Sequence, residues 1–210
     1  AQEWSAAEDG KVWTFKITDK AKFHDGTPLT AEDVAYSYQR TLRANKQRAS
    51  LLSGYLDVDG VVATDPTTVV MTLKTPYAAF DRLLAFLEQP IVSKAVAMAN
   101  DKDGDEGAAY LVDHEAGSGP FKIKNWQIGQ VYELEAVPDY WQGWPGDGRL
   151  AGVVWKKTED VATRKTGLLS GDFDMADTIS VNDIDEINNS GSKKAEVNYG
   201  LLGGYLKMNT

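Results

Sequence analysis

Apolar and polar side chains alternate in the segment VWTFKI, which places Trp13, Phe15 and Ile17 on one face. A period of two residues is typical of a strand with one buried face. The stretch GVVATDPTTVVMTLKTP indicates two further strands on either side of an Asp65-Pro66 turn, the second over residues 68–73. The first part of the chain therefore predicts a small sheet.

Apolar side chains recur at three and four residues elsewhere, which predicts helices. One helix is expected from about Ala31 to about Arg43. A second covers AAFDRLLAFLEQP and stops at Pro90, because proline cannot continue a helix. Shorter helices are expected over SKAVAMAN, over VATRKTGLLSG with an end at Gly171, and after Ser180.

The second half of the chain mixes strands with these helices. GSGPFKIKNWQIGQVYELEA predicts a hairpin that turns at Gly129, and AGVVWKK predicts another strand. We expect FDMA to form a short strand, and AEVNYG and GYLKMN to form the last two strands. Hairpins together with crossovers define an α/β or mixed α+β fold with mixed sheets.

The segment KFHDGTPLTAEDV raises the first question of chemistry, because it brings His24 and Asp25 close to the carboxylates of Glu32 and Asp33. A metal or acid/base site is one interpretation, but the spacing matches no mechanistic histidine motif. The other is structural. Glycine and proline turn the chain, and Thr30 with Asp33 forms a capping-box variant at a helix start. We favour the structural interpretation.

Composition narrows the classes of function. The chain has 22 basic and 31 acidic residues, a formal net charge of −9, which argues against a nucleic-acid partner. It has no cysteine, so thiol nucleophiles, disulfides and Cys-ligated metal centres are excluded. No apolar run approaches the roughly 20 residues that cross a bilayer, so we expect no transmembrane segment. No motif calls for a cofactor or a metal.

Clustered carboxylates leave a carboxylate-based hydrolase open as an alternative. The stretch DKDGDEG is loosely similar to a calcium loop, but counting from Asp101 puts Val112 where the loop needs its twelfth-position glutamate. We therefore expect a mobile surface loop there. GSGPF lacks the lysine of a phosphate loop, and TGLLSG is not the elbow of a serine hydrolase.

The order of several motifs resembles one known family. The chain contains FHDGTPLTAEDVAYS, then GSGPF, then PDYW, then SGDFD. This series is similar to the extracellular solute-binding proteins of family 5, the receptors of ABC importers for peptides, nickel and some oligosaccharides. The resemblance covers nearly the whole chain and implies part of a lobe of the type II periplasmic-binding-protein fold.

The resemblance also implies a division of the chain and a function. Residues 1–113 correspond to an accessory domain and residues 114–210 to part of the first main lobe, while the second lobe is absent. Such receptors are not enzymes; they close two lobes over a solute and dock on permease subunits. We expect an oligopeptide or dipeptide in the cleft between lobes, with an incomplete site in this fragment. A module that senses solutes without transporting them is a further alternative.

By the same resemblance, the ligand-binding candidates are the segment Asp177, Thr178 and Ile179, together with Tyr205 and Tyr55. An ordinary sheet residue at Tyr205 and a loop or cap residue at Asp177 remain equal alternatives. A periplasmic or extracellular location is implied, with a lipid anchor on a preceding segment as one option. The residues themselves do not distinguish a peptide from an opine, a sugar or a metal chelate.

Overall fold

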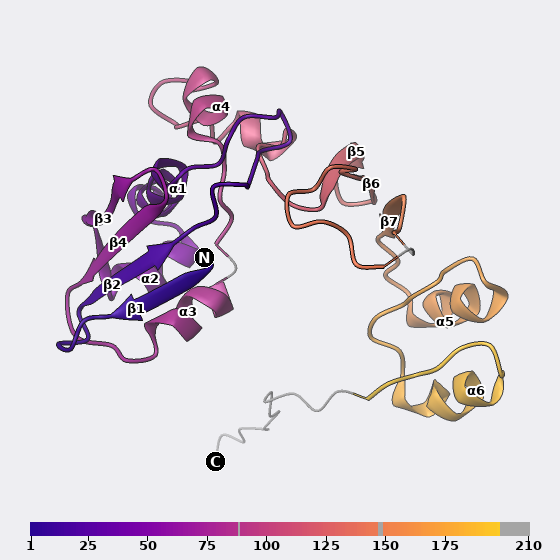
Figure 1. Cartoon of the computed structure of the whole chain (residues 1–210). Helices are drawn as coiled ribbons and strands as arrows, with labels where there is room; N and C mark the ends of the chain where they lie inside the picture. The colour runs from indigo at the N-terminus through magenta and orange to yellow at the C-terminus, as the bar shows by residue number, and fades with distance from the viewer. Residues whose placement is uncertain (88, 147–148, 198–210) are drawn as a thin grey trace, which may run out of the picture. The chain divides into compact units, whose positions relative to one another are not determined.

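The structure is a computed structural model that describes residues 1–87, 89–146 and 149–197 (Figure 1). The chain divides into two compact units, Ala1–Trp155 and Lys156–Thr210. The boundary expected after residue 113 falls inside the first unit and stays a prediction. The mixed α+β class is confirmed, because both antiparallel strands and helices build the first unit.

A four-stranded sheet organises the beginning of the first unit. Its order is β1 (Glu3–Ala6), β2 (Val12–Lys16), β4 (Thr68–Leu73) and β3 (Leu56–Asp65), and every neighbouring pair is antiparallel. The three strands expected around VWTFKI and the Asp65-Pro66 turn are confirmed. Strand β1 was not anticipated, because all four of its residues are exposed and its sequence carries no buried face.

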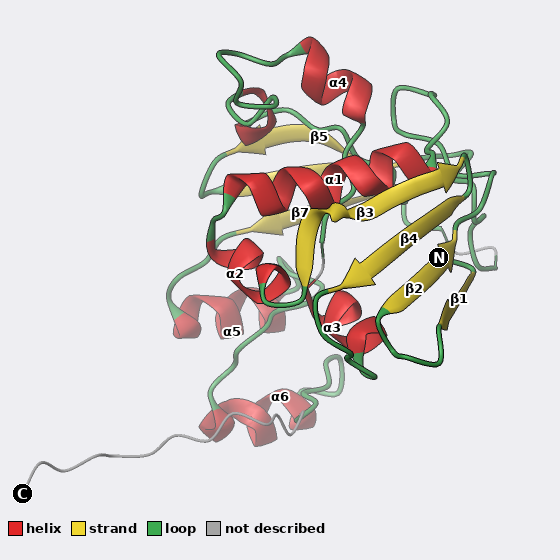
Figure 2. Ribbon diagram, turned by 90° about the vertical axis from the view of Figure 1, so that its left-hand side faces the viewer, coloured by secondary structure: helices red, strands yellow, loops and turns green. Residues whose placement is uncertain are grey.

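Helices complete this part of the unit: α1 (Ala31–Ala44), α2 (Gln47–Ser53), α3 (Phe80–Leu87) and α4 (Lys94–Ala99). Figure 2 shows α1 lying along β3. The expected helices α1, α3 and α4 are confirmed, whereas α2 was missed.

The core lies between the sheet and these helices. Trp13 of β2 packs against Phe80 of α3 with ring centroids 5.8 Å apart, and both side chains are buried. Phe15 and Ile17 pack against the same core, so the face expected from the alternating pattern is confirmed. Each fully buried large apolar side chain contributes about 1.5–3 kcal/mol to folding, which makes this cluster the main stabilising element.

A second, three-stranded sheet follows the short helix η1 (Tyr110–Val112). Strands β5 (Phe121–Gln127) and β6 (Val131–Ala136) form the expected antiparallel hairpin, and β7 (Gly152–Lys156) adds to β6. Gly129 has a φ of 75° in the hairpin turn, a conformation that favours glycine. On β7, Val154 and Trp155 are 68% and 63% exposed.

The second unit contains α5 (Val161–Ser170), the short helix η2 (Val181–Asp183) and α6 (Ile184–Asn189). Gly171 ends α5 in a left-handed conformation, as expected. The expected strand at FDMA is wrong, because residues 173–176 pair with no other strand in the part of the chain that the structure describes. Residues 195–197 of AEVNYG are not a strand either, and GYLKMN lies outside the described residues.

Candidate functional site

The HDGTP segment has a structural role. Asp25 Oδ1 accepts hydrogen bonds from the N–H and the hydroxyl of Thr27, at 2.9 and 2.6 Å, and Gly26 has a φ of 87°. The His24 ring is largely buried between two acceptors: Nδ1 lies 2.9 Å from Glu115 Oε1, and Nε2 lies 2.9 Å from the Gly119 carbonyl oxygen. The histidine therefore ties this turn to the segment before β5.

The two histidines do not converge. His114 stacks on Tyr110 and pairs with Asp113, its own neighbour, at 2.6 Å. No group of three or more His, Asp and Glu side chains in the described ranges could hold a metal ion. The interpretation of KFHDGTPLTAEDV as a turn and a helix start accounts for the contacts of this segment.

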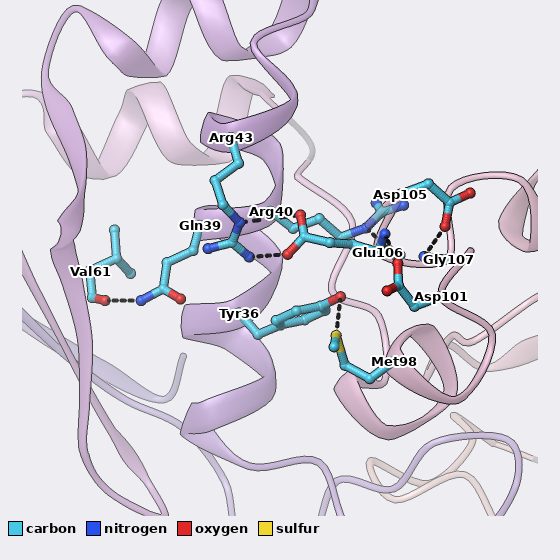
Figure 3. A network of polar contacts seen from close by, with 10 residues as sticks. All are labelled: Tyr36, Gln39, Arg40, Arg43, Val61, Met98, Asp101, Asp105, Glu106 and Gly107. Carbon is cyan, nitrogen blue, oxygen red and sulfur yellow. Dashed lines mark hydrogen bonds and ion pairs between the residues drawn. The ribbon is translucent and has the colours of Figure 1, made fainter. Parts of the chain in front are cut away.

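The acidic stretch 101–107 is a surface loop with its own hydrogen-bonded frame (Figure 3). Asp105 accepts hydrogen bonds from the N–H groups of Lys102, Ala109 and Gly107, and the first two of these contribute most to lowering the pKa of its carboxyl. Arg43 pairs with Glu106, and Arg40 Nε donates to the Glu106 carbonyl oxygen at 2.9 Å. The carboxylates of Asp101, Asp105 and Glu106 thus bind groups of the protein itself.

Two further groups of carboxylates also have partners within the protein. Asp33 accepts the Thr30 and Lys94 N–H groups, and Glu32 pairs with Lys94. A hollow of about 360 Å³ beside His24 contains Glu115 and Glu135, but Glu115 pairs with His24 and Glu135 with Lys122, at 3.0 Å. Glu115 and Glu135 therefore do not form the pair of free, facing carboxylates that a glycoside hydrolase requires.

The three consecutive candidates form one loop of the second unit. Asp177, Thr178 and Ile179 lie between α5 and η2, and the first two are exposed. Thr178 has a φ of 54°, a left-handed conformation that a β-branched residue rarely adopts. No described residue exchanges a hydrogen bond with the backbone of Thr178 or Ile179. The loop therefore presents main-chain donors and acceptors to whatever lies beside it.

Arg164 of α5 holds this loop and was missed in the sequence. Its Nη1 donates to the Asp177 carbonyl oxygen at 3.2 Å and lies 3.5 Å from Asp177 Oδ1. A signal existed, because a cation in the first turn of a helix opposes the helix dipole and so suggests another role.

Of the two tyrosine candidates, the structure describes only Tyr55. Tyr55 lies in the first unit, stacked on Tyr77 with centroids 4.6 Å apart and packed against the core. Its part in binding stays a prediction, although this packing supplies a structural reason for an aromatic residue there. Tyr205 lies outside the described residues.

Comparison with known proteins assigns the chain to a family. The family described as bacterial extracellular solute-binding proteins, family 5 Middle, matches residues 1–210. The chain belongs to this family. None of the described helices has the length and hydropathy to cross a membrane.

Individual relatives support the same conclusion. The chain is 35% identical over 210 residues to the probable D,D-dipeptide-binding periplasmic protein DdpA of Escherichia coli K12, covering 100% of this chain and 39% of the relative. It is 28% identical over 216 residues to the glutathione-binding protein GsiB of the same strain, again covering 100% and 39%. The chain thus spans about two fifths of the length of these relatives.

Solved structures show the same fold. AgaA of A. tumefaciens R10, in complex with agropinic acid, superposes with a TM-score of 0.74 at 32% identity, over 90% of this chain and 36% of that one. The oligopeptide-binding protein AppA of Bacillus subtilis, in complex with a nonapeptide, gives a TM-score of 0.74 at 26% identity, over 89% and 36%. The periplasmic-binding-protein-like fold is therefore confirmed.

Proposed function

We propose that the protein to which this chain belongs is the solute receptor of an ABC importer and binds a dipeptide or oligopeptide. Family membership supports the receptor role. The peptide is favoured by the names of the relatives, which bind D,D-dipeptides, glutathione and a nonapeptide. AgaA, with its agropinic acid, makes an opine the principal competing solute.

The observation that carries the proposal is that the loop Asp177–Ile179 has backbone groups without hydrogen-bond partners among the described residues. An extended peptide is held mainly by hydrogen bonds to its main chain, and these need unpaired N–H and C=O groups on the receptor. The backbones of Thr178 and Ile179 have no hydrogen-bond partner among the described residues. We infer that this loop forms one wall of the solute site.

The proposal keeps the division into an accessory domain, residues 1–113, and part of a main lobe, residues 114–210. The exposed Val154 and Trp155 of β7 support a contact with a further part of the receptor, because large exposed apolar side chains often mark a surface on which another segment packs. We infer that the remaining walls belong to the rest of the receptor. The 210-residue chain alone should then bind solute weakly or not at all.

The proposed location is outside the cytoplasmic membrane, in the periplasm or at the cell surface, where such a receptor would meet its permease subunits. DdpA is described as periplasmic, which supports this placement. A lipid anchor on a preceding segment stays a prediction. It would be tested by labelling cells with a lipid precursor and isolating the full-length protein.

Isothermal titration calorimetry of the full-length protein tests the proposed solute. The panel consists of D-alanyl-D-alanine, glutathione, a nonapeptide and agropinic acid, after removal of any solute that copurifies. Tight binding of a peptide is expected. Binding of agropinic acid with no response to any peptide would overturn the assignment of a peptide as the solute. Absence of binding to all four compounds would overturn both the peptide and the opine as solutes.

The same preparation separates a receptor from a hydrolase. We expect no turnover of chromogenic glycosides or peptides, because the carboxylates beside His24 and at the start of α1 are paired with cations or N–H groups. Steady turnover of any of them would contradict the receptor. Genes for permeases and ATPases beside the parent gene would favour transport over sensing.

A further inference from the structure

The Arg164 side chain is placed where its charge brings little stability. It rises from the first turn of α5, where the helix dipole disfavours a cation. Its side chain is only 17% exposed, and its Nε is buried with no partner among the described residues. Burying a guanidinium in this way costs free energy. A role for Arg164 is therefore sought in the groups that its side chain contacts.

What Arg164 holds is main chain on both sides of its helix. Nη2 donates to the Glu159 carbonyl oxygen at 3.3 Å, before α5, and Nη1 donates to the Asp177 carbonyl oxygen at 3.2 Å, after it. The Asp177 carboxylate is 78% exposed and 3.5 Å away, so this ion pair is weak. The carbonyl contacts are therefore the specific ones.

The peptide unit that Arg164 holds directly precedes the strained residue. A left-handed Thr178, with its φ of 54°, persists only if its surroundings hold it there. On the far side, the Ser180 hydroxyl oxygen accepts the Asn182 N–H at 3.3 Å and starts η2. The loop is thus fixed at both ends, by Arg164 before Thr178 and by Ser180 after it.

We propose that Arg164 is a positioning residue for solute binding. It holds Asp177 so that Thr178 stays left-handed, and this conformation orients the free backbone groups of Thr178 and Ile179 toward the solute. The inference rests on the proposed function. It adds a residue that does not touch solute and acts through the conformation of its neighbour.

The test is calorimetry on the full-length protein with the peptide of the panel that binds best. Arg164→Gln should raise Kd about ten-fold, because the binding-competent loop becomes a minor conformation. Arg164→Lys should give a smaller loss, since the lysine ammonium keeps the charge and can still donate to a carbonyl oxygen but lacks the planar fork of the guanidinium. Thermal unfolding of each variant shows whether it is folded.

Two further variants separate positioning from stability. Asp160→Ala removes the cap of α5, whose Oδ2 accepts the Thr163 N–H, and should lower the unfolding midpoint while leaving Kd within two-fold. Thr178→Gly makes the left-handed conformation accessible without help. Added to Arg164→Gln, it should recover a large part of the lost affinity.

The outcomes distinguish the two proposals. Wild-type binding that Arg164→Gln leaves unchanged, an equal loss in Asp160→Ala, or no recovery by Thr178→Gly would each overturn the role of Arg164 and leave the receptor intact. Absence of binding by the wild-type protein to any member of the panel would overturn the proposed solutes, and this inference with them.

Discussion

The carboxylate of Asp33 accepts the backbone N–H of Lys94 at 3.0 Å, and so joins the start of α1 to the start of α4, 61 residues further along the chain. Its other oxygen accepts the N–H and the hydroxyl of Thr30, both at 2.9 Å. The sequence pattern correctly predicted the capping box. One carboxylate thus serves two helix starts and is buried in doing so.

Asp33→Asn should destabilise the protein by about 2–3 kcal/mol, because the amide keeps only one acceptor oxygen and no charge, so either the Thr30 N–H or the Lys94 N–H loses its acceptor. Thr30→Ala should cost only about 1 kcal/mol. The matched control is Glu32→Gln, which removes an exposed ion pair with Lys94 and should cost less than about 0.5 kcal/mol. Urea unfolding measures all three, and an equal loss at Asp33 and Glu32 would contradict the shared cap.

His24→Ala should destabilise the protein by about 2 kcal/mol, because Glu115 and the Gly119 carbonyl both lose a partner in a largely buried place. His114→Ala is the control, since that ring is half exposed and should change stability by no more than about 0.5 kcal/mol. Chemical unfolding compares them. Equal effects would show that His24 does not tie the turn to the segment before β5.

The hydrogen bond from the Thr68 hydroxyl, followed by that from the Thr67 N–H, lowers the pKa of Asp65 from its usual 3.8 to about 2. A carboxyl with a depressed folded-state pKa stabilises the fold above its unfolded pKa, and this contribution is lost as the pH falls through the folded value. We therefore expect Asp65 to add to the loss of stability between about pH 4 and pH 2. Asp65→Asn should flatten the wild-type curve of unfolding free energy in that window, and an unchanged slope would contradict the shift.

Gly167→Ala should destabilise the protein by roughly 1–3 kcal/mol, although alanine normally favours a helix over glycine by about 1 kcal/mol. The reason is close packing, because a Cβ at Gly167 would lie 2.6 Å from the Phe173 ring. Adding Phe173→Leu should recover part of the loss. Thermal unfolding tests both variants, and a more stable Gly167→Ala would show that the ring moves aside freely.

Most of the fold could be predicted from the sequence, because its signals were local. The alternation around Trp13 and the helical spacing after Thr30 each leave a periodic trace. Strand β1 left no such trace, since all of its side chains are exposed and no alternation of buried and exposed positions marks it, although it pairs with the neighbouring β2. The strand predicted over FDMA was wrong for a different reason, because its apolar residue Phe173 packs on Gly167 of α5 and not on a sheet.

The candidate site was only partly predictable. Motif resemblance led to Asp177, Thr178 and Ile179, which the structure brings together in one loop. Arg164 could not be found in this way, because it lies 13 residues before Asp177 and acts through carbonyl oxygens that any residue possesses. The left-handed conformation of Thr178 could not be predicted either, since threonine carries no sequence signal for it.

The most direct test of the account is a crystal structure of the full-length protein with its solute bound. The account predicts electron density for an extended peptide in a cleft between two lobes, with its main chain within hydrogen-bond distance of the Thr178 or Ile179 backbone. Density for a solute that contacts no residue of the loop Asp177–Ile179 would contradict it.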